Sequence, residues 1–271
     1  MDIVKDKVWN GAVNIRVEFN GSHYLLLAYR LAYFPLFYSE ISAFFSDLTG
    51  NDITAAPVWL EYEDVPLKWN LPIGVLYDLF FLPGHKEPRG PWVLELKTQT
   101  VNLKYPDDSI IPFRISQGLP TYEKTLSQTI LHSLKQSCYA INGNSRAMIN
   151  LSEDDTKALW NSIQTHDYSI YHNVVAKITR GSPFQKIPIR VYVAGSSTLI
   201  QVPITVSEDG HPRTLGSALM SCLPSAFVKT SIGVAYIHGI NVDLLFDQPI
   251  LDVWQTFRHL DNFLYIVVLV S

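Results

Sequence analysis

Two segments of this chain, far apart in the sequence, are similar to each other, and this similarity limits the possible folds. The sequence DVPLKWNLPIGVLYDLF occupies residues 64–80, and NVDLLFDQPILDVWQTF occupies residues 241–257. A constant shift of 177 residues aligns the two, and it places Pro72-Ile73 on Pro249-Ile250, Val65 on Val242, Leu67 on Leu244, Trp69 on Phe246 and Phe80 on Phe257. A phrase that returns at a fixed distance indicates two copies of one folding unit.

The C-terminal third gives the clearest pattern of elements. Two stretches rich in β-branched residues, 187–193 and 199–206, flank a Gly-Ser turn and predict a hairpin. Residues 214–223 carry Leu215, Ala218, Leu219 and Cys222 at the spacing of an amphipathic helix. Strands are expected at 233–240 and 263–270. A hairpin, one helix and two further strands in this order predict a β-grasp, or ubiquitin-like, domain.

The N-terminal third repeats this order. Strands are expected at 12–19 and 23–31 around an Asn-Gly-Ser turn, followed by a helix at 34–48 whose apolar stripe is Phe37, Ile41 and Phe44. Further strands are expected at 57–64 and 92–103, with a Pro/Gly-rich surface loop at 82–91. Two ubiquitin-like units in one chain account for the repeated phrase.

The middle of the chain has a helical pattern instead. Residues 121–141 place Leu126, Ile130, Leu134 and Cys138 on one face, and residues 151–163 begin with a capping box formed by Ser152 and Asp155. Residues 167–178 form another helix or continue that one. The predicted class is α+β, with two ubiquitin-like (β-grasp) domains flanking a helix-rich domain. The expected divisions are an N-terminal helix (1–10), the first ubiquitin-like domain (11–104), the helix-rich domain (118–180) and the second ubiquitin-like domain (187–271).

The composition narrows the class of protein. Of 271 residues, 47% are hydrophobic, which suffices for folded cores, and the net charge is −4 with scattered basic residues, which argues against nucleic-acid binding. The start MDIVKDKVWNG has no apolar run for a signal peptide, and the apolar run 263–270 is far shorter than the ~20 residues of a spanning helix. We expect a soluble, intracellular protein.

Recognisable catalytic chemistry is missing. No Walker, GxGxxG, HExxH or GxSxG motif occurs, and the histidines are dispersed, so no metal site and no cofactor are expected. Cys138 or Cys222 is a possible thioester-carrying nucleophile. The helical, apolar surroundings of Cys138 offer no base or cation to activate it, so a packed thiol is the better interpretation. The ending VVLVS has no glycine tail, so we do not expect the chain to be the donor in a ubiquitin-type transfer.

Several blocks resemble the autophagy protein 5 family. They are VWNG (8–11), PLKWNLPIGVLYD (66–78), CYAINGNSRAMINLS (138–152) with LW (159–160), and FLYIVVLV (263–270), in the family's order. The resemblance implies a cytoplasmic scaffold of autophagosome formation, recruited peripherally to the preautophagosomal membrane. It also implies that the ubiquitin-like modifier autophagy protein 12, the N-terminal helix of the coiled-coil autophagy protein 16 and the autophagy conjugating enzymes are partners. Such an assembly promotes attachment of autophagy protein 8 to phosphatidylethanolamine.

One position departs from the family. The resemblance places the lysine that accepts the modifier in the segment INGNSRAMIN, where this chain has Arg146. A guanidinium, with a pKa above ~12, does not supply the neutral amine that attacks a thioester. Three interpretations stay open: Arg146 is an engineered block of conjugation, it belongs to a lineage whose two proteins associate without a covalent link, or Lys135 or Lys157 accepts the modifier instead. In the non-covalent case Arg146 contributes a charge-assisted hydrogen bond to the modifier.

Three further residues are candidates for partner binding. Trp69 and Asn70 lie in a turn of the repeated phrase, where Trp69 either meets a partner or folds back into the core. Trp9, on a short helix at about residues 2–9, either clasps a partner or covers the edge of a sheet, and the resemblance favours the partner. The expected function is a non-enzymatic scaffold that holds the modifier near Arg146 and the partner helix in a groove between the two ubiquitin-like units. A cysteine thioester carrier and a ubiquitin-like adaptor outside autophagy are the alternatives.

Overall fold

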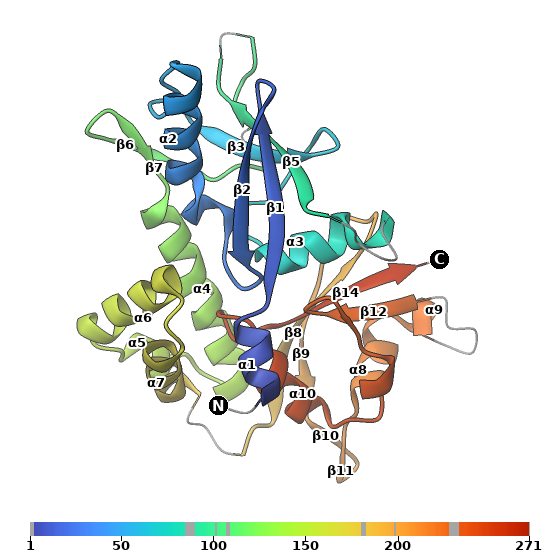
Figure 1. Cartoon of the computed structure of the whole chain (residues 1–271). Helices are drawn as coiled ribbons and strands as arrows, with labels where there is room; N and C mark the ends of the chain where they lie inside the picture. Colours follow the sequence, from blue (N-terminus) through green and yellow to red (C-terminus); the bar gives the residue numbers. More distant parts are fainter. Residues whose placement is uncertain are drawn as a thin grey trace. The chain divides into compact units, whose positions relative to one another are not determined.

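The computed structural model describes residues 3–84, 90–100, 102–106, 109–179, 183–197, 199–227 and 233–270. The chain divides into two compact units, one comprising residues 10–129 and the other comprising residues 1–9 together with 130–271 (Figure 1). Arg180 and part of the loop expected at 82–91 lie outside the described residues.

The unit of residues 10–129 contains a five-stranded sheet of order β2-β1-β5-β3-β4. Strands β1 and β2 are antiparallel, and β1 runs parallel to β5. The strands are β1 (Ala12–Phe19), β2 (Ser22–Tyr29), β3 (Val58–Tyr62), β4 (Val65–Pro66) and β5 (Trp92–Thr98), with helices α2 (Tyr38–Thr49) and α3 (Ile73–Phe80). A small hairpin that the sequence did not predict, β6 (Arg114–Ser116) with β7 (Leu119–Thr121), follows them.

The C-terminal sheet has the same topology, with order β13-β12-β14-β8-β9 and with β8 parallel to the last strand, β14. Its elements are β8 (Lys186–Val193), β9 (Leu199–Thr205), α8 (Leu215–Cys222), α9 (Pro224–Phe227), β12 (Gly233–Ile237), β13 (Ile240–Asn241), α10 (Ile250–Phe257) and β14 (Leu264–Val270), with a minor hairpin of β10 (Ser207–Glu208) and β11 (His211–Pro212). In both sheets the last strand lies beside the first, so the predicted pair of β-grasp domains is confirmed.

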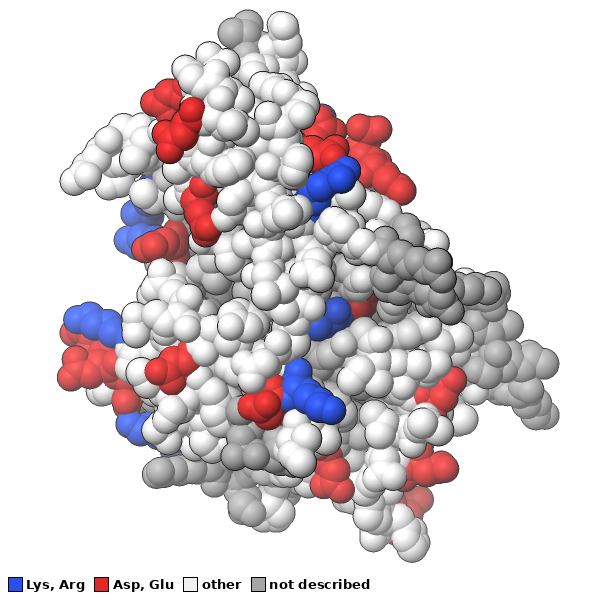
Figure 2. All heavy atoms as spheres, in the orientation of Figure 1, with Lys and Arg blue, Asp and Glu red and all other residues white. Residues whose placement is uncertain are grey.

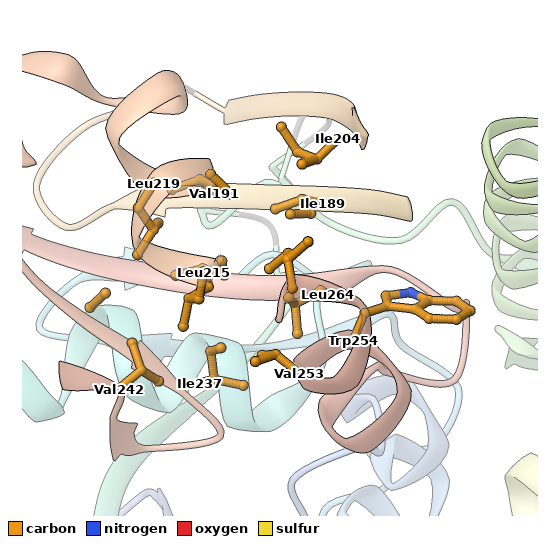
Figure 3. Close-up of a cluster of buried hydrophobic side chains, with 14 of the residues drawn as sticks. Ile189, Val191, Ile204, Leu215, Leu219, Ile237, Val242, Val253, Trp254 and Leu264 are labelled. Atoms are coloured by element: carbon orange, nitrogen blue, oxygen red, sulfur yellow. The ribbon is translucent and has the colours of Figure 1, made fainter. Parts of the chain in front are cut away.

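The core of the C-terminal sheet forms between its strands and two helices. Figure 3 shows Ile189 of β8, Leu264 of β14, Leu215 of α8 and Val253 of α10 pointing toward one another, and all four are buried. Trp254, also of α10, is fully buried, and its Nε1 donates to the carbonyl of Asn262 at 2.7 Å. The helical spacing of Leu215, Ala218 and Leu219 therefore identified a real core face.

The repeated phrase is a true structural repeat, but the constant shift of 177 is wrong for its first half. Helices α3 and α10, which begin after Pro72 and Pro249, obey that shift. The strands ahead of them obey a shift of 175, because Leu67 donates to Leu60 just as Val242 donates to Ala235. Leu67 is thus the counterpart of Val242, and both are buried, whereas Leu244 is 94% exposed. Two extra residues in the second copy, where a 3₁₀ turn spans Asp243–Leu245, shift the phase.

The apolar stripe predicted for the first helix is also partly wrong. A 3₁₀ turn at Phe34–Leu36 precedes α2, so the helix proper starts at Tyr38. Its buried face contains Ile41, as predicted, but also Tyr38 and Phe45, while Phe44 faces outward. Which residues face the core depends on where the helix begins. Because Phe44 and Phe45 are adjacent, the sequence alone does not show which of them is buried.

The helical elements are α1 (Ile3–Trp9), α4 (Glu123–Asn142), α5 (Arg146–Ile149), α6 (Glu153–Thr165) and α7 (Tyr168–Ile178). The predicted face of α4 is confirmed, since Leu126, Ile130, Leu134 and Cys138 are all buried. Ser152 caps α6 by accepting from the backbone of Asp155 at 3.0 Å. Helices α6 and α7 are separate, because His166 between them adopts a left-handed conformation (φ 56°).

Candidate functional site

Arg146 lies in an exposed loop just beyond the C-terminal end of α4. Gly143, with φ 70°, terminates that helix, and the short helix α5 then starts at Arg146 itself. The side chain of Asn144 accepts a hydrogen bond from the Arg146 backbone at 3.0 Å, which shapes the turn. The guanidinium faces solvent, and within the described part of the chain no carboxylate pairs with it.

The loop is fixed from beneath by two side chains of α4. Asn142 donates through Nδ2 to the carbonyl of Ile178 on α7 at 3.0 Å and to the Cys138 sulfur at 3.4 Å. The Cys138 thiol in turn donates to the carbonyl of Asn144 at 3.6 Å. These contacts hold the end of α4, the loop and the end of α7 in one arrangement, so Arg146 is presented from a rigid base.

Two open hollows adjoin this loop. One, of about 730 Å³, lies between Arg146, the ends of α4 and α7, and the segment that precedes β8. The other, of about 710 Å³, lies between α4 and the β8–β9 hairpin, and Lys135, Tyr139, Lys186 and Pro203 are among its lining residues. Lys186 and the C-terminal end of α4 border both hollows. We call the residues lining these two hollows the Arg146 surface.

The Arg146 surface combines positive charge with exposed apolar groups. Lys135, Arg146 and Lys186 are exposed, and among the described residues none of them forms a salt bridge. Lys177, by contrast, is held by Asp155 at 2.7 and 2.8 Å. Tyr139 on α4 is 63% exposed. Next to this surface, and lining neither hollow, Ile149 lies one turn beyond Arg146 on α5 and is 62% exposed. Unpaired cations beside exposed apolar side chains suit a protein partner with complementary acidic groups.

The two alternative acceptor lysines occupy different positions. Lys135 lines the hollow beside the β8–β9 hairpin and therefore belongs to the Arg146 surface. Lys157 lies on α6, where it pairs with Glu153 at 2.6 Å, and it lines neither hollow. Of the two lysines, Lys135 is the one that belongs to the Arg146 surface.

Replacing Asn142 with alanine is expected to loosen the Arg146 loop. The change removes the hydrogen bond to Ile178 and leaves that carbonyl and the Cys138 thiol with fewer partners, at a cost of about 1–2 kcal/mol. Urea unfolding measures that loss, and alkylation of Cys138 by iodoacetamide is expected to become faster than in the native chain. The matched control is Asn144→Ala, which leaves the contact between α4 and α7 intact. Equal effects of the two variants would contradict the role of Asn142.

The predicted partner-binding residues do not share one environment. Trp69 is half-buried and Asn70 is exposed, and both lie in the turn between β4 and α3, in the unit of residues 10–129. Trp9 belongs to the other unit and is only 6% exposed. Its ring stacks on His166 with centroids 4.5 Å apart and contacts Tyr168 and Tyr171, each at 5.2 Å. Trp9 thus packs against α7 and the α6–α7 turn of its own unit.

In the part of the chain that the structure describes, neither cysteine has the surroundings of an activated nucleophile. Cys138 is fully buried under the Arg146 loop. Burial raises the pKa of the half-buried Cys222 thiol, only partly offset by Ser221 and Arg213, which disfavours the reactive thiolate. In the described residues no group of three or more His, Cys, Asp and Glu side chains could hold a metal ion. None of the described helices is both long and apolar enough to cross a membrane.

Two ubiquitin-like folds joined to a helical region, with a fixed and exposed loop at the end of its longest helix, define a tandem ubiquitin-like protein. Models of three parts of one family match it: "Autophagy protein ATG5, UblA domain" at residues 8–98, "alpha-helical bundle region" at 123–181 and "UblB domain" at 186–268. The chain belongs to the autophagy protein 5 family, as the sequence resemblance indicated.

Relatives of that name support this assignment along the whole length. Autophagy protein 5 of Debaryomyces hansenii is 41% identical, over 99% of this chain and 95% of that protein. The Scheffersomyces stipitis protein is 38% identical, over 98% and 96%. The crystal structure of Kluyveromyces marxianus Atg5, 23% identical, has the same fold, with a TM-score of 0.79 over 98% of this chain and 99% of that one.

Proposed function

We propose that this chain is a non-catalytic scaffold of the autophagy conjugation machinery that binds the modifier autophagy protein 12 on the Arg146 surface. The observation that carries the proposal is the position of Arg146. Arg146 lies in an exposed loop that is fixed by Asn142 and bordered by two hollows. It is also the position at which the resemblance to the family places the acceptor lysine. The tandem ubiquitin-like fold and the family membership support the same role.

The chemistry of Arg146 favours non-covalent association. Its guanidinium stays protonated, so it does not attack a thioester, but it offers several donors for a carboxylate or carbonyl of the modifier. Lys135 and Lys186 add positive charge nearby, and Tyr139 adds an apolar contact of the kind enriched at interfaces. The modifier is then retained by the surface area buried in the complex and by complementary charge rather than by an isopeptide bond.

A second surface serves the N-terminal helix of autophagy protein 16. Trp69, half-buried, and Asn70, exposed, present an aromatic ring and a polar group side by side in the turn before α3. That pairing suits one face of a partner helix. Trp9 contributes indirectly, by holding α1 in place. With both partners bound and the assembly recruited peripherally to the preautophagosomal membrane, the chain brings the conjugating enzyme to phosphatidylethanolamine and favours transfer of autophagy protein 8 by proximity.

Mixing the chain with purified autophagy protein 12 tests the proposal. The native chain is expected to form a complex that survives gel filtration and separates on denaturing electrophoresis. Arg146→Glu is expected to weaken that complex at least about tenfold, because it replaces a favourable charge with a repulsive one. The control, Lys157→Glu, reverses a charge away from the Arg146 surface and is expected to leave binding unchanged.

Adding the conjugation enzymes separates the acceptor interpretations. The native chain is expected to give no shifted band, and Arg146→Lys is expected to give one, since it restores an amine. A shifted band with the native chain that disappears in Lys135→Arg would assign the acceptor to Lys135 and overturn the non-covalent proposal. Rapid iodoacetamide labelling of Cys138 or Cys222 in the native chain would favour the thioester-carrier alternative. Failure to co-purify with autophagy protein 16 would favour an adaptor outside autophagy.

A further inference from the structure

Strand β2 leaves an unpaired edge on the N-terminal sheet. It is the outermost strand of the order β2-β1-β5-β3-β4, and it pairs with β1 along all eight of its residues. In an antiparallel pair, every second residue of a strand forms hydrogen bonds with the neighbouring strand. The backbone N–H of Arg30 donates to the Gly11 carbonyl at the end of this pairing, so every second residue back from Arg30 along β2 bonds to β1. By that alternation, the N–H and C=O groups of Leu25 and Leu27 point away from β1 toward the open edge.

The side chains at these two positions are apolar and exposed. Leu25 is 65% exposed and Leu27 is 66% exposed, on the face of the sheet opposite the core. Within the described residues nothing hydrogen-bonds to their backbone groups. An eight-residue edge strand with outward-pointing backbone groups and exposed leucine side chains is a template for another strand, and folded proteins normally protect such edges.

The second copy of the fold protects the matching edge. The strand registers show which residues of the two sheets correspond. Ile15 on β1 pairs with Leu26 on β2 and with Trp92 on β5. In the same way, Ile189 on β8 pairs with Val202 on β9 and with Leu264 on β14, so Leu26 corresponds to Val202. Counting one residue along each edge strand makes Leu27 the counterpart of Pro203, and Leu25 the counterpart of Gln201. Proline has no backbone N–H, so β9 lacks a hydrogen-bond donor at the position where the Leu27 N–H of β2 is available to a partner strand.

The surface beside the β2 edge is acidic and apolar. Helix α2 lies next to β2 (Figure 1), with Tyr24 and Phe44 rings 4.8 Å apart. Leu48 of α2 is 55% exposed, and the charged residues of this helix are Glu40 and Asp47, both exposed. Neither β2 nor α2 contains a lysine or arginine. Figure 2 shows acidic side chains over α2 beside an uncharged surface over β2.

We propose that the β2 edge binds an extended segment of a partner protein as an added strand, with apolar and basic residues alternating along that segment. The free groups of Leu25 and Leu27 specify a strand rather than a helix. Apolar side chains of the segment lie against these leucines on one face, and its basic side chains reach Glu40 and Asp47 on the other. A second copy of this chain fits less well, because two such edges would bring their acidic α2 helices together. This site is independent of the Arg146 surface.

A synthetic peptide of alternating valine and lysine tests the proposal with the full chain. Fluorescence anisotropy is expected to show binding, and hydrogen exchange is expected to show new protection of the Leu25 and Leu27 amides. The variant Leu25→Gln/Leu27→Pro copies the protected edge of β9 and is expected to bind at least about tenfold more weakly. Leu244→Gln, which removes an exposed leucine elsewhere, is the matched control and is expected to bind normally.

Two further comparisons keep the test independent of the folding of the proline variant. Asp47→Lys, with the strand unchanged, is expected to weaken binding of the lysine peptide, and methylation of the peptide's backbone nitrogens is expected to abolish binding. Absence of binding to the native chain, binding without protection of the two amides, or equal binding to Leu25→Gln/Leu27→Pro would overturn the proposal. Self-association of the native chain that Leu27→Pro abolishes would assign the edge to a second copy instead.

Discussion

Replacing Asp261 with alanine is expected to lower the free energy of unfolding of its unit by about 3–5 kcal/mol, because it leaves a buried guanidinium without its carboxylate. Arg190 on β8 donates to Asp261 at 2.8 Å, and the two side chains are 11% and 1% exposed. The hydroxyl of Tyr265 donates to the same carboxylate oxygen at 2.8 Å, and the Phe263 backbone donates to the other at 3.1 Å. Three donors therefore share the Asp261 carboxylate, and all of them lose this acceptor in the variant.

The consequence reaches α4, the helix that leads into the Arg146 loop. The second terminal nitrogen of Arg190 lies 3.4 Å from the Ser133 hydroxyl and 3.5 Å from the Gln136 side-chain oxygen, both on α4. The guanidinium also lies over the Phe263 ring at 3.8 Å. A loss of Asp261 frees Arg190 to move and thereby weakens the contact of β8 with α4. We expect binding of the modifier to fall along with stability.

Urea unfolding followed by tryptophan fluorescence measures this effect. A double-mutant cycle with Arg190→Met isolates the pair, and Arg190→Met/Asp261→Leu is expected to recover much of the loss, since apolar residues of similar size need no partner. Lys157→Ala, which removes an exposed ion pair, is the control and is expected to change stability little. A loss below about 1 kcal/mol for Asp261→Ala would mean that the buried pair contributes no more than a surface one.

The sequence predicts the main strands of both sheets and the helices α4 and α8, because each has its own periodic pattern, but it did not predict the helices α3 and α10. The faces of α4 and α8 follow from i, i+3, i+4 spacing, and both are buried. The Arg190–Asp261 pair has no such pattern, since its members lie 71 residues apart and only the parallel pairing of β8 with β14 brings those regions together. Without the topology, Arg190 in a strand and Asp261 in a turn would each be predicted to lie on the surface.

Single-residue roles were harder to predict than elements. The resemblance identified the segment that contains Arg146, but the contacts of Asn142 that fix this loop depend on α7, far along the chain. Trp69 and Phe246 fall at the same place in the repeated phrase, yet two extra residues in the second copy alter their surroundings. Trp9 lies at the end of a seven-residue helix, and nothing local indicates that α7 will cover it.

Replacing Trp9 with alanine is expected to destabilise its unit by about 3–5 kcal/mol, because the change empties a large, buried aromatic site. It also breaks a reciprocal contact with His166. The indole of Trp9 donates to the His166 carbonyl at 3.3 Å, while the His166 Nε2 lies 2.9 Å from the Trp9 carbonyl. Trp9→Phe is expected to cost less, since it keeps a ring against Tyr171. The control is Trp69→Ala, which removes a half-buried ring and is expected to reduce partner binding with a smaller effect on stability.

The pH dependence of unfolding separates this role of Trp9 from direct contact with a partner. Burial lowers the pKa of His166 below its ordinary 6.5, an effect that its hydrogen bond to Trp9 only partly offsets. As the pH falls, His166 therefore takes up a proton in the unfolded chain before it does so in the folded chain. The contribution of neutral His166 to stability is complete above about pH 6.5, and it declines as the pH falls from there to the lower pKa of the folded state. In Trp9→Ala the His166 ring is expected to become exposed, and the part of the decline below about pH 6.5 that is due to His166 is expected to disappear. Parallel declines in the native chain and the variant, measured by urea unfolding, would show that Trp9 does not keep His166 buried.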